Sequence, residues 1–474
     1  MCKTALLNLV SADNCLKFRA CAQRYNLDEV FVKTNQEITS SFAEVVRQDD
    51  FVQLDIDNMS AVIKLKDKTC GEALFTGIVQ WVNHNPLQRE ELFVNLFSQM
   101  EFSSMSKDFL VHVSKENLVR NSSVCLSLLV DETLKLAQSP FTGKILIVGG
   151  NESPNDCVVY DVITRQPTHL PNLNIGRSGT AAVKVGSKVY VVGGFAAVDE
   201  DGYGDSDSND NEDHDSDDTD EEGGQSDDEG GLSNDVGGHG DDEVDLSDDE
   251  DDLSDDEGGN EHQSCEILDL NEPTEWKVLP DMSKHRLNCG AGFIADHIYL
   301  TGGQNQNATT LSSCEKFDIH NKMWTKIKNM LHAREEHGTV VCNESLYCLG
   351  GYDDETVVLS SCERYDVRSD VWNEIAPLSE PRGGLTCVVL DGNIYAIGGF
   401  KNLKTVERLN PRLGTWENIA PLQHDHGQLS ACVIGNKIFV IGGKTVEVYD
   451  PTLNVWATAF EIEKPVSGAA VVAI

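Results

Sequence analysis

A pair of glycines that ends a short apolar run recurs along the last two-thirds of the chain, and its spacing is regular. Six pairs occur, beginning at Gly149, Gly193, Gly302, Gly350, Gly398 and Gly442. Trp276, Trp324, Trp372 and Trp416 each precede the first glycine of the next pair by the same interval (302 − 276 = 350 − 324 = 398 − 372 = 442 − 416 = 26). The pairs themselves repeat at intervals of 48 (350 − 302, 398 − 350) and 44 (442 − 398). A repeat of this length indicates a propeller or a solenoid.

Each repeat has the pattern of four short strands. The first strand follows an arginine or its equivalent, the second ends in the glycine pair, the third contains a glutamate and the fourth surrounds the tryptophan. Four strands per unit with paired glycines describe a propeller blade. The glycines allow positive φ angles and a close backbone approach. The tryptophans are expected to pack between neighbouring blades and hold them together.

The two ends of the repeat region predict how the propeller closes. The repeats begin at a second strand, residues 144–150, and end after a first strand, residues 467–474. These two halves complete one blade. We therefore predict a closed six-bladed ring over residues 144–474, in which the C-terminal strand pairs with residues 145–150 and leaves no open sheet edge.

Residues 1–138 have a helical pattern instead. Apolar residues recur at helical spacing in three stretches, around Leu16, Trp81 and Phe97. Asn14 and Ser106 stand where helix N-caps are expected. The predicted fold class is an α-helical domain followed by an all-β six-bladed propeller, with a long insert in one blade.

The insert is a strongly acidic interruption of one repeat. The interval from the second glycine of a pair to the third-strand glutamate is 12 in two repeats (315 − 303, 363 − 351), but 72 from Gly194 to Glu266 (266 − 194). Residues 199–261 hold 31 Asp or Glu and no Lys or Arg, which accounts for most of the net charge of −42. Such a composition cannot bury a core, so we predict a disordered loop.

Three roles for the insert remain open. It is a solvated spacer, a segment regulated by phosphorylation, or an electrostatic lure for basic partners that could also mimic an acidic ligand of the propeller. Added phosphate would deepen the negative charge. The candidate phosphorylation sites are serines followed by acidic residues, namely Ser226, Ser247 and Ser254.

The cysteines and the apolar runs bear on location. The chain has 14 cysteines that largely follow the repeat and form no CxxC pair, so we interpret them as buried reduced thiols. Neither a run of eighteen apolar residues nor a signal-peptide pattern is present. We expect a soluble, cytoplasmic protein, with the nucleus as an alternative location. No cofactor or metal site is expected, because no ligand or nucleophile cluster can be assembled from the spacing.

The helical segment resembles the BACK domain of the BTB-BACK-kelch (kelch-like) family, and the repeats resemble kelch repeats. The matching helical residues are Asp13-Asn14-Cys15-Leu16, Asp50-Phe51-Val52-Gln53-Leu54, Ala73-Leu74-Phe75, Trp81-Val82 and Arg89. Family members normally carry a BTB domain first, whereas here Met1 lies almost inside the first BACK helices, so the sequence is interpreted as BACK and kelch without BTB. The resemblance implies binding to cullin-3. In the family, the BTB domain supplies dimerisation and most of the contact with cullin-3.

The family also implies where a substrate would lie. Its substrates lie across the propeller face built from the loops between the second and third strands and between the fourth strand and the next first strand. By motif match, that face should contain Ser178, Phe195, Gln304, Asn305, Glu335, Tyr352, Asp353, Phe400, Lys401 and Lys444. The repeated arginine position adds Arg286, Arg334, Arg382 and His426, for which a structural role toward loop carbonyls and carboxylates is the stronger interpretation.

The predicted function is therefore non-enzymatic substrate recognition. The BACK helices would connect to a cullin-3 ubiquitin ligase while the propeller binds a protein target. The alternative is a propeller that binds actin or another cytoskeletal scaffold without a ligase. The acidic charge opposes nucleic-acid binding, and no membrane contact is expected.

Overall fold

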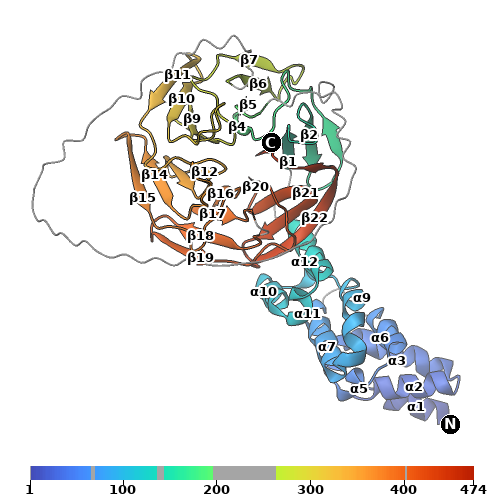
Figure 1. Cartoon of the computed structure of the whole chain (residues 1–474). Coiled ribbons are helices and arrows are strands. Elements are labelled where there is room, and N and C mark those ends of the chain that lie inside the picture. Colours follow the sequence, from blue (N-terminus) through green and yellow to red (C-terminus); the bar gives the residue numbers. More distant parts are fainter. Residues whose placement is uncertain (1, 66–69, 136–142, 196–262, 401–402) are drawn as a thin grey trace, which may run out of the picture. The chain divides into compact units, whose positions relative to one another are not determined.

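The computed structural model describes residues 2–65, 70–135, 143–195, 263–400 and 403–474. The predicted acidic insert at 199–261 lies outside these ranges, and so do Lys401 and the candidate phosphorylation sites Ser226, Ser247 and Ser254. Within the described residues the chain forms an N-terminal helical region and a six-bladed β-propeller (Figure 1). The predicted fold class is confirmed.

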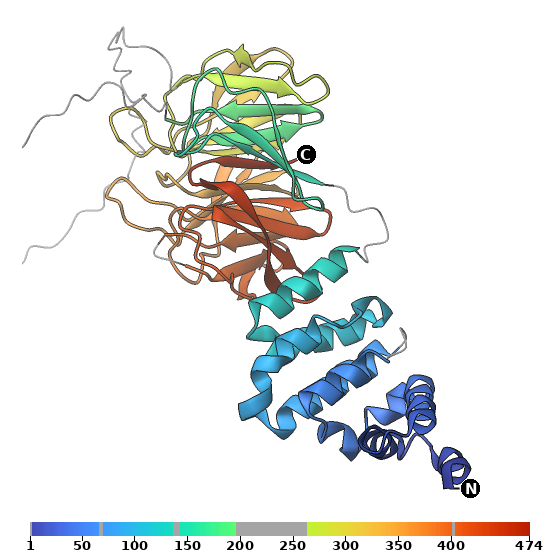
Figure 2. The same cartoon turned by 90° about the vertical axis from the view of Figure 1, so that its right-hand side faces the viewer.

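The helical region is a succession of mostly short helices. In Figure 2 they follow one another in chain order from the N-terminus to α12. Their bounds are α1 (Cys2–Leu9), α2 (Cys15–Arg24), α3 (Asp28–Ser40), α4 (Phe42–Val45), α5 (Asp49–Val52), α6 (Ile56–Ile63), α7 (Gly71–His84), α8 (Pro86–Arg89), the 3-10 helix η1 (Glu90–Leu92), α9 (Phe93–Phe97), the 3-10 helix η2 (Phe102–Ser104), α10 (Lys107–Lys115), α11 (Asn117–Arg120) and α12 (Ser123–Lys135).

Trp81 and Arg89 join helix α7 to the segment after α5. The indole Nε1 of Trp81 donates to the carbonyl of Leu54 at 2.7 Å. Nη1 of Arg89 donates to the carbonyls of Val52 and Trp81, each at 2.8 Å, and the guanidinium lies 4.2 Å from the centre of the Trp81 ring. A cation over an indole face is favourable. Two of the residues that carry the BACK resemblance thus connect these helices.

The two predicted N-caps have different outcomes. The hydroxyl of Ser106 accepts from the N–H of Phe109 at 3.3 Å and caps α10, as predicted. Asn14 precedes α2 but makes no capping bond. Its side-chain amide accepts from the N–H of Ser11 and donates to the carbonyl of Leu9, so it closes the turn from α1. Asn14 thus has the predicted N-cap position but does not make the predicted capping bond.

The propeller consists of six sheets, most of them antiparallel sets of four strands. Blade 1 holds β1 (Lys144–Val148), β2 (Cys157–Asp161), β3 (Pro167–His169) and β23 (Ala470–Ala473); blade 2 holds β4 (Ala181–Val185), β5 (Lys188–Val192), β6 (Cys265–Asp269) and β7 (Lys277–Leu279); blade 3 holds β8 (Gly290–Ile294), β9 (His297–Thr301), β10 (Cys314–Asp318) and β11 (Met323–Ile327).

The remaining blades continue the same order. Blade 4 holds β12 (Gly338–Cys342), β13 (Ser345–Leu349), β14 (Cys362–Asp366) and β15 (Val371–Ile375); blade 5 holds β16 (Thr386–Leu390), β17 (Asn393–Ile397), β18 (Val406–Asn410) and β19 (Thr415–Asn418); blade 6 holds β20 (Ser430–Ile434), β21 (Lys437–Asp450) and β22 (Val455–Val466). In Figure 1 the first strands β4, β12, β16 and β20 lie near the centre of the ring, and β7, β11, β15 and β19 lie at its rim.

Blade 6 contains one strand that folds back on itself. Strand β21 spans 14 residues, which would be about 45 Å long if straight. The ammonium of Lys437 at its start nevertheless donates to the carboxylate of Asp450 at its end. The two halves of β21 therefore stand for the second and third strands of this blade.

The ring closes as the repeat pattern predicts. Strand β23 pairs with β1 in antiparallel register, with Ile145 opposite Ala473 and Val148 opposite Ala470. The N–H groups of Lys144 and Ile474 each donate to the other residue's carbonyl. Segments from both ends of the repeat region thus share one sheet, and the predicted pairing with residues 145–150 is confirmed for residues 145–148.

Tryptophans connect successive blades. The indole of Trp372 in blade 4 donates to the carbonyl of Lys328, which follows the last strand of blade 3, at 2.9 Å. Trp276, Trp324, Trp416 and Trp456 make the same kind of bond to a carbonyl of the blade before. The predicted packing of tryptophan between blades is confirmed.

Helix α12 packs against blade 6. The hydroxyl of Ser127 donates to the carbonyl of Thr458 on β22 at 2.7 Å, and Arg165 of blade 1 forms an ion pair with Asp131 at 3.0 Å. Apolar residues of α12 and β22 belong to one continuous buried cluster. This contact joins the helical region to the propeller.

Candidate binding face of the propeller

The repeated arginine is part of a buried ion pair in each of blades 2 to 5, and a histidine takes its place in blade 6. The pairs are Arg177 with Glu266, Arg286 with Glu315, Arg334 with Glu363, Arg382 with Glu407, and His426 with Glu447, with N to O distances of 2.6 to 3.1 Å. The arginine precedes the first strand of its blade and the glutamate lies on the third, so each pair joins two segments of one blade.

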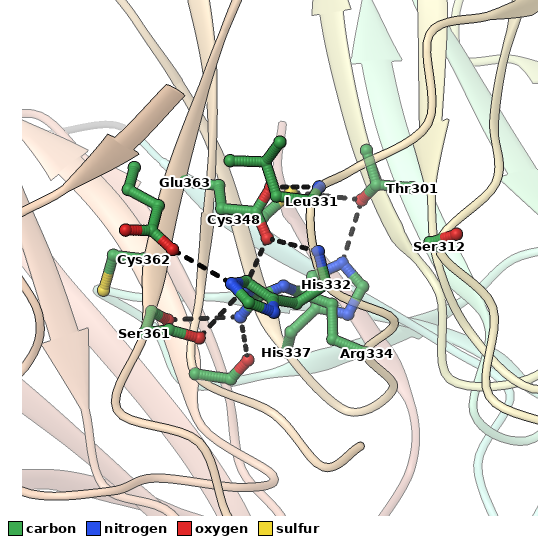
Figure 3. A network of polar contacts seen from close by, with 12 residues as sticks. Thr301, Ser312, Leu331, His332, Arg334, His337, Cys348, Ser361, Cys362 and Glu363 are labelled. Carbon is green, nitrogen blue, oxygen red and sulfur yellow. Dashed lines mark hydrogen bonds and ion pairs between the residues drawn. The ribbon is translucent and has the colours of Figure 1, made fainter. Parts of the chain in front are cut away.

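Figure 3 shows the pair of blade 4 and its hydrogen bonds. Arg334 donates to the carbonyl of Gly350 at 2.6 Å, to the carbonyl and hydroxyl of Ser361 at 3.1 and 3.2 Å, and to Glu363 at 2.6 Å. Glu363 also accepts from the N–H groups of Leu331 and His332. A buried charge is tolerated only when it is paired and hydrogen-bonded in this way.

This burial decides the role of the arginine position. The side chains of Arg286, Arg334 and Arg382 are at most 1% exposed, and His426 is buried as well. They lie inside the blades and hold the loops in place, so none of the four presents its charged group on the surface. Their inclusion among the surface candidates is corrected accordingly, and the structural interpretation of this position applies.

The glycine pairs bring neighbouring loops together. In blade 3 the N–H of Gly303 donates to the carbonyl of Arg334 at 2.9 Å. A Cβ atom on Gly302, whose φ is +57°, would lie 2.3 Å from that same carbonyl. Only glycine fits at such a distance. The close approach that the sequence predicted is therefore an approach to the first loop of the next blade.

As a result, in blades 2 to 5 the residue directly after the glycine pair is bonded through its backbone to the residue after the arginine. Glu335 and Tyr352 exchange two backbone hydrogen bonds, at 3.0 and 2.9 Å. Ser178 pairs in the same way with Phe195, and the N–H of Phe400 donates to the carbonyl of Gly383. The two sets of positions singled out by the repeat thus lie side by side along one face.

The other predicted face residues differ in what they contact. Gln304 donates to the carboxylate of Glu335 at 3.2 Å. Asn305 and Asp353 accept backbone N–H groups of their own loops, so they shape turns. Phe195 is 46% exposed, and Lys444 is exposed on β21.

Two aromatic rings form a platform over a pair of glycines. The ring centres of Tyr352 and Phe400 are 6.0 Å apart. A Cβ atom on Gly383 would lie 2.2 Å from the Tyr352 ring, and one on Gly384 would lie 2.6 Å from the Phe400 ring. Any side chain at these two positions would displace the rings. Gly383 and Gly384 therefore seat the platform.

Two adjacent carboxyl groups border this platform, and the repeat pattern pointed only to the first. Burial raises the pKa of Glu335 above its ordinary value. Burial, followed by the charge of Glu335, raises the pKa of Glu336 to about 7. Burial and the charges of these two residues also raise the pKa of Tyr352. Glu336 belongs to the site, and no repeated motif could have identified it, because the equivalent positions of the other blades hold glycine, asparagine or glutamine.

The described residues hold features that bear on other kinds of site. None of the helices in the described ranges has an apolar stretch long enough to cross a lipid bilayer. Across the same residues, no three His, Cys, Asp or Glu side chains gather into a group that could hold a metal ion. The cysteines with described side chains are free thiols. Those predicted to be buried at repeat positions are so, except Cys387, which is partly exposed.

Comparison with known protein families matches both parts of the chain. A model of the KLHDC2/KLHL20/DRC7 Kelch-repeats domain matches residues 255–458. The BACK model, described as BTB And C-terminal Kelch, matches residues 15–115. These ranges correspond to much of the propeller and to most of the helical region.

Individual kelch-like proteins are similar over part of their length. Kelch-like protein 2 of Rattus norvegicus is 27% identical over 207 residues, which cover 38% of this chain and 35% of that protein. Kelch-like protein 11 of Homo sapiens is 27% identical over 233 residues, 42% of this chain and 33% of the relative. Kelch-like protein 3 of Bos taurus is 25% identical over 220 residues, 41% and 37% respectively.

The chain matches about a third of the length of these curated relatives. The match to the two domain models agrees with the contacts described above. Trp81 and Arg89 connect helices within the range of the BACK model, and the repeated glycines and arginines connect the loops of the blades. The chain thus combines a helical region that matches the BACK model with a six-bladed β-propeller that matches the kelch-repeat model, and it is similar to kelch-like proteins over part of its length.

Proposed function

We propose that the protein is a non-enzymatic adaptor that binds a protein target on the loop face of its propeller and presents it to a cullin-3 ubiquitin ligase. The observation that carries the proposal is the bonded row of loop residues, including Glu335, Tyr352 and Phe400, held in place by the buried ion pairs beneath. Such a face offers varied side chains on a rigid scaffold, which suits recognition of a polypeptide.

The link to the ligase rests on the resemblance of the helical region to BACK domains. The BACK match over residues 15–115 and the packing of α12 on β22 support a role as connector, because a target held by the propeller would be coupled to whatever the helices bind. The proposed location is the cytoplasm, with the nucleus as an alternative.

Affinity capture with the full chain tests the target half of this proposal. The informative variant is Tyr352→Ala, and the matched control is Leu413→Ala. Leu413 is 73% exposed and follows β18, at the opposite end of the strands from Tyr352. We expect specific proteins to be captured by the wild type and the control but lost from Tyr352→Ala. Identical capture by all three would overturn the use of this face.

The ligase half is tested in the same experiment. Recovery of cullin-3, with accumulation of the captured targets when the protein is depleted from cells, supports an adaptor. Recovery of actin or another cytoskeletal protein that depends on Tyr352, without cullin-3, would replace the adaptor by the scaffold-binding alternative.

A further inference from the structure

A polar cavity of about 210 Å³ lies where the first strands of the blades converge. Its lining comes from the residues just before the first strands and from the beginnings of those strands, and it includes Asn288, Glu336, His337, Gly384 and Gln428. Backbone bonds connect these turns from blade to blade. The N–H of Asn288 donates to the carbonyl of Gly179, that of Glu336 to Asn288, and that of Gly384 to Glu336, at 2.9 to 3.0 Å.

Glu336 stands out among the lining residues by its backbone conformation. Its φ is +48°, in the left-handed region. The equivalent residues of blades 2, 3 and 5 are Gly179, Asn288 and Gly384, with φ of 54 to 65°. Glycine and asparagine adopt this conformation readily, whereas a glutamate there is strained. Strained residues concentrate at functional sites.

The carboxylate of Glu336 is only half satisfied. Oε1 accepts from Nδ2 of Asn288 at 3.1 Å, while Oε2 is shielded from solvent and has no hydrogen-bond partner among the described residues. A carboxylate turns about χ3 at little cost, so either oxygen can be directed into the cavity that the side chain lines. A shielded, unpartnered carboxylate oxygen costs free energy until a donor reaches it.

The charged groups around Glu336 do not neutralise it. Glu335 has the same sign of charge and raises the pKa of Glu336, and Asp354 in turn raises the pKa of Glu335. Arg286 and Arg334 are engaged with Glu315 and Glu363. His337 lies alongside, and burial together with the charges of those two arginines lowers its pKa to about 3, so its imidazole is neutral.

The aromatic platform borders the same point. A Cβ atom on Gly384 would lie 2.6 Å from the Phe400 ring and 3.3 Å from Oε2 of Glu336. The absence of a side chain at Gly384 therefore leaves the ring and the carboxylate facing a common space. A carboxylate beside aromatic faces in a partly desolvated cavity is an arrangement that favours a cation.

From these contacts we propose that the part of the cavity at Glu336 is a subsite for one lysine or arginine side chain of the bound protein. The inference rests on the proposed function, since it assigns the chemistry of the partner to the same loop face. The ammonium or guanidinium would supply the donor that Oε2 lacks and lie against Tyr352 and Phe400. The acidic residues 199–261 have the wrong sign to occupy this subsite, so competition by that segment as a mimic of the ligand is disfavoured.

The subsite is tested by selecting binders from a phage-displayed library of random short peptides on the full chain. Enriched peptides are then made with a fluorophore, and their affinity is measured for the wild type, Glu336→Gln and Glu355→Gln. Glu355 is an exposed carboxylate of the adjacent loop, so its variant removes the same charge from the same face. Non-specific attraction to the acidic segment acts equally on both variants and is screened by salt.

We expect the enriched peptides to share a lysine or arginine. Replacing that residue by methionine, or using Glu336→Gln, should each weaken binding about tenfold or more, with little further loss when both changes are combined. Glu355→Gln should change affinity by less than about twofold. Thermal unfolding of each variant checks that the fold is retained.

Two other outcomes overturn the inference and differ in what they say of the proposed function. Peptides that lose affinity on Tyr352→Ala but bind Glu336→Gln as tightly as the wild type, or that share no basic residue, would remove the cationic subsite and leave the binding face intact. Peptides indifferent to both substitutions, or a library that yields no binder, would count against the subsite and the face together.

Discussion

Glu336 combines a left-handed backbone, a shielded oxygen and a neighbouring carboxylate. The shielding and the neighbouring carboxylate both oppose ionisation of this side chain. Because its pKa in the folded chain, about 7, lies above the ordinary value of 4.5, ionising Glu336 destabilises the native state. This destabilisation is absent below about pH 4.5, grows as the pH rises toward 7 and stays constant above that.

Glu336→Gln should therefore stabilise the protein at about pH 8 by roughly 1 to 3 kcal/mol and leave it nearly unchanged at about pH 4. Glutamine keeps the acceptor for Asn288 and removes the charge. Thermal unfolding across this pH range measures the effect, with Glu355→Gln as control. A lower melting temperature for Glu336→Gln at pH 8 would mean that the charge is already compensated.

His426 replaces the arginine of the other blades and makes blade 6 sensitive to pH. Although burial acts to lower its pKa, the hydrogen bonds to Glu447 and Gly442 outweigh this and raise the pKa of His426. The charge of Asp425 acts in the same direction. Because the pKa is raised, the protonated His426 stabilises the folded protein. This stabilisation is fully present below the pKa of histidine in the unfolded chain, near 6.5, and is lost as the pH rises through the pKa in the folded chain.

His426→Arg should remove this loss of stability at high pH. Thr445 precedes Glu447 by two residues, as Ser361 precedes Glu363, so the partners for a guanidinium are in place. We expect the variant to be about 1 to 3 kcal/mol more stable than the wild type at about pH 9 and to gain less at about pH 6. His424→Arg adds the same charge at an exposed position and should have no comparable effect; equal gains from the two would refute the explanation.

How far individual residues could be predicted depends on repetition. Arg286, Arg334 and Arg382 recur at one position, and recurrence is what indicated a role within the blade, as their burial shows. Glu336 is found by the opposite signal, an acidic residue at a position where the other blades have glycine, asparagine or glutamine. The departure could not be interpreted from the sequence, because the contact between Gly384, Phe400 and Glu336 depends on the positions of three separate loops.

Among the elements, the fourth strands are joined to the preceding blade through indole hydrogen bonds of unequal burial. Trp372 is 4% exposed, whereas Trp324 is partly exposed, although their bonds to Lys328 and Pro280 are of equal length at 2.9 Å. An unsatisfied buried carbonyl costs more than one that water can reach. The two positions therefore form a natural comparison.

Trp372→Phe should destabilise the protein by about 1 to 3 kcal/mol, and Trp324→Phe by clearly less, since water can replace the lost donor only at the second site. Chemical denaturation of the two variants beside the wild type measures the difference. Equal losses would mean that the indole bond contributes little and that ring packing alone holds the blades together.

Blade 1 is joined to its neighbouring blade without a tryptophan on its fourth strand. Pro167 stands where the spacing calls for a tryptophan, yet β3 is present at Pro167–His169. The joint with blade 6 is made by the extended strand β22, where Phe460 lies 6.0 Å from Tyr160 between ring centres and the N–H of Glu463 donates to the Tyr160 hydroxyl. The length of β22 was not predictable, because the repeat supplies no equivalent strand for comparison.

At the scale of the whole molecule, the net charge is divided very unevenly. Of the total of −42, residues 199–261 contribute −31 and the other 411 residues −11. The flanking described strands β5 and β6 pair in full register despite the long interruption between Gly194 and Glu266. The pairing of this blade does not require a short connection.

Deleting residues 199–261 should leave the melting temperature within about 4 °C of the wild type, because changing the loop length alters closure entropy by only about 2 kcal/mol. Differential scanning calorimetry measures the shift, and the comparison at low and high salt separates charge repulsion from closure. A collapse of the melting temperature would show that the segment contributes to the core.

The pairing of β23 with β1 also sets the order in which the protein can be completed. Ile145 and Ala473 are 328 residues apart (473 − 145), and a ribosome adds about 5 to 20 residues per second. Strand β1 is thus synthesised roughly a quarter of a minute to a minute before its partner. During that interval its free edge can bind other strands, which makes the nascent chain a client for chaperones until translation reaches the last strand.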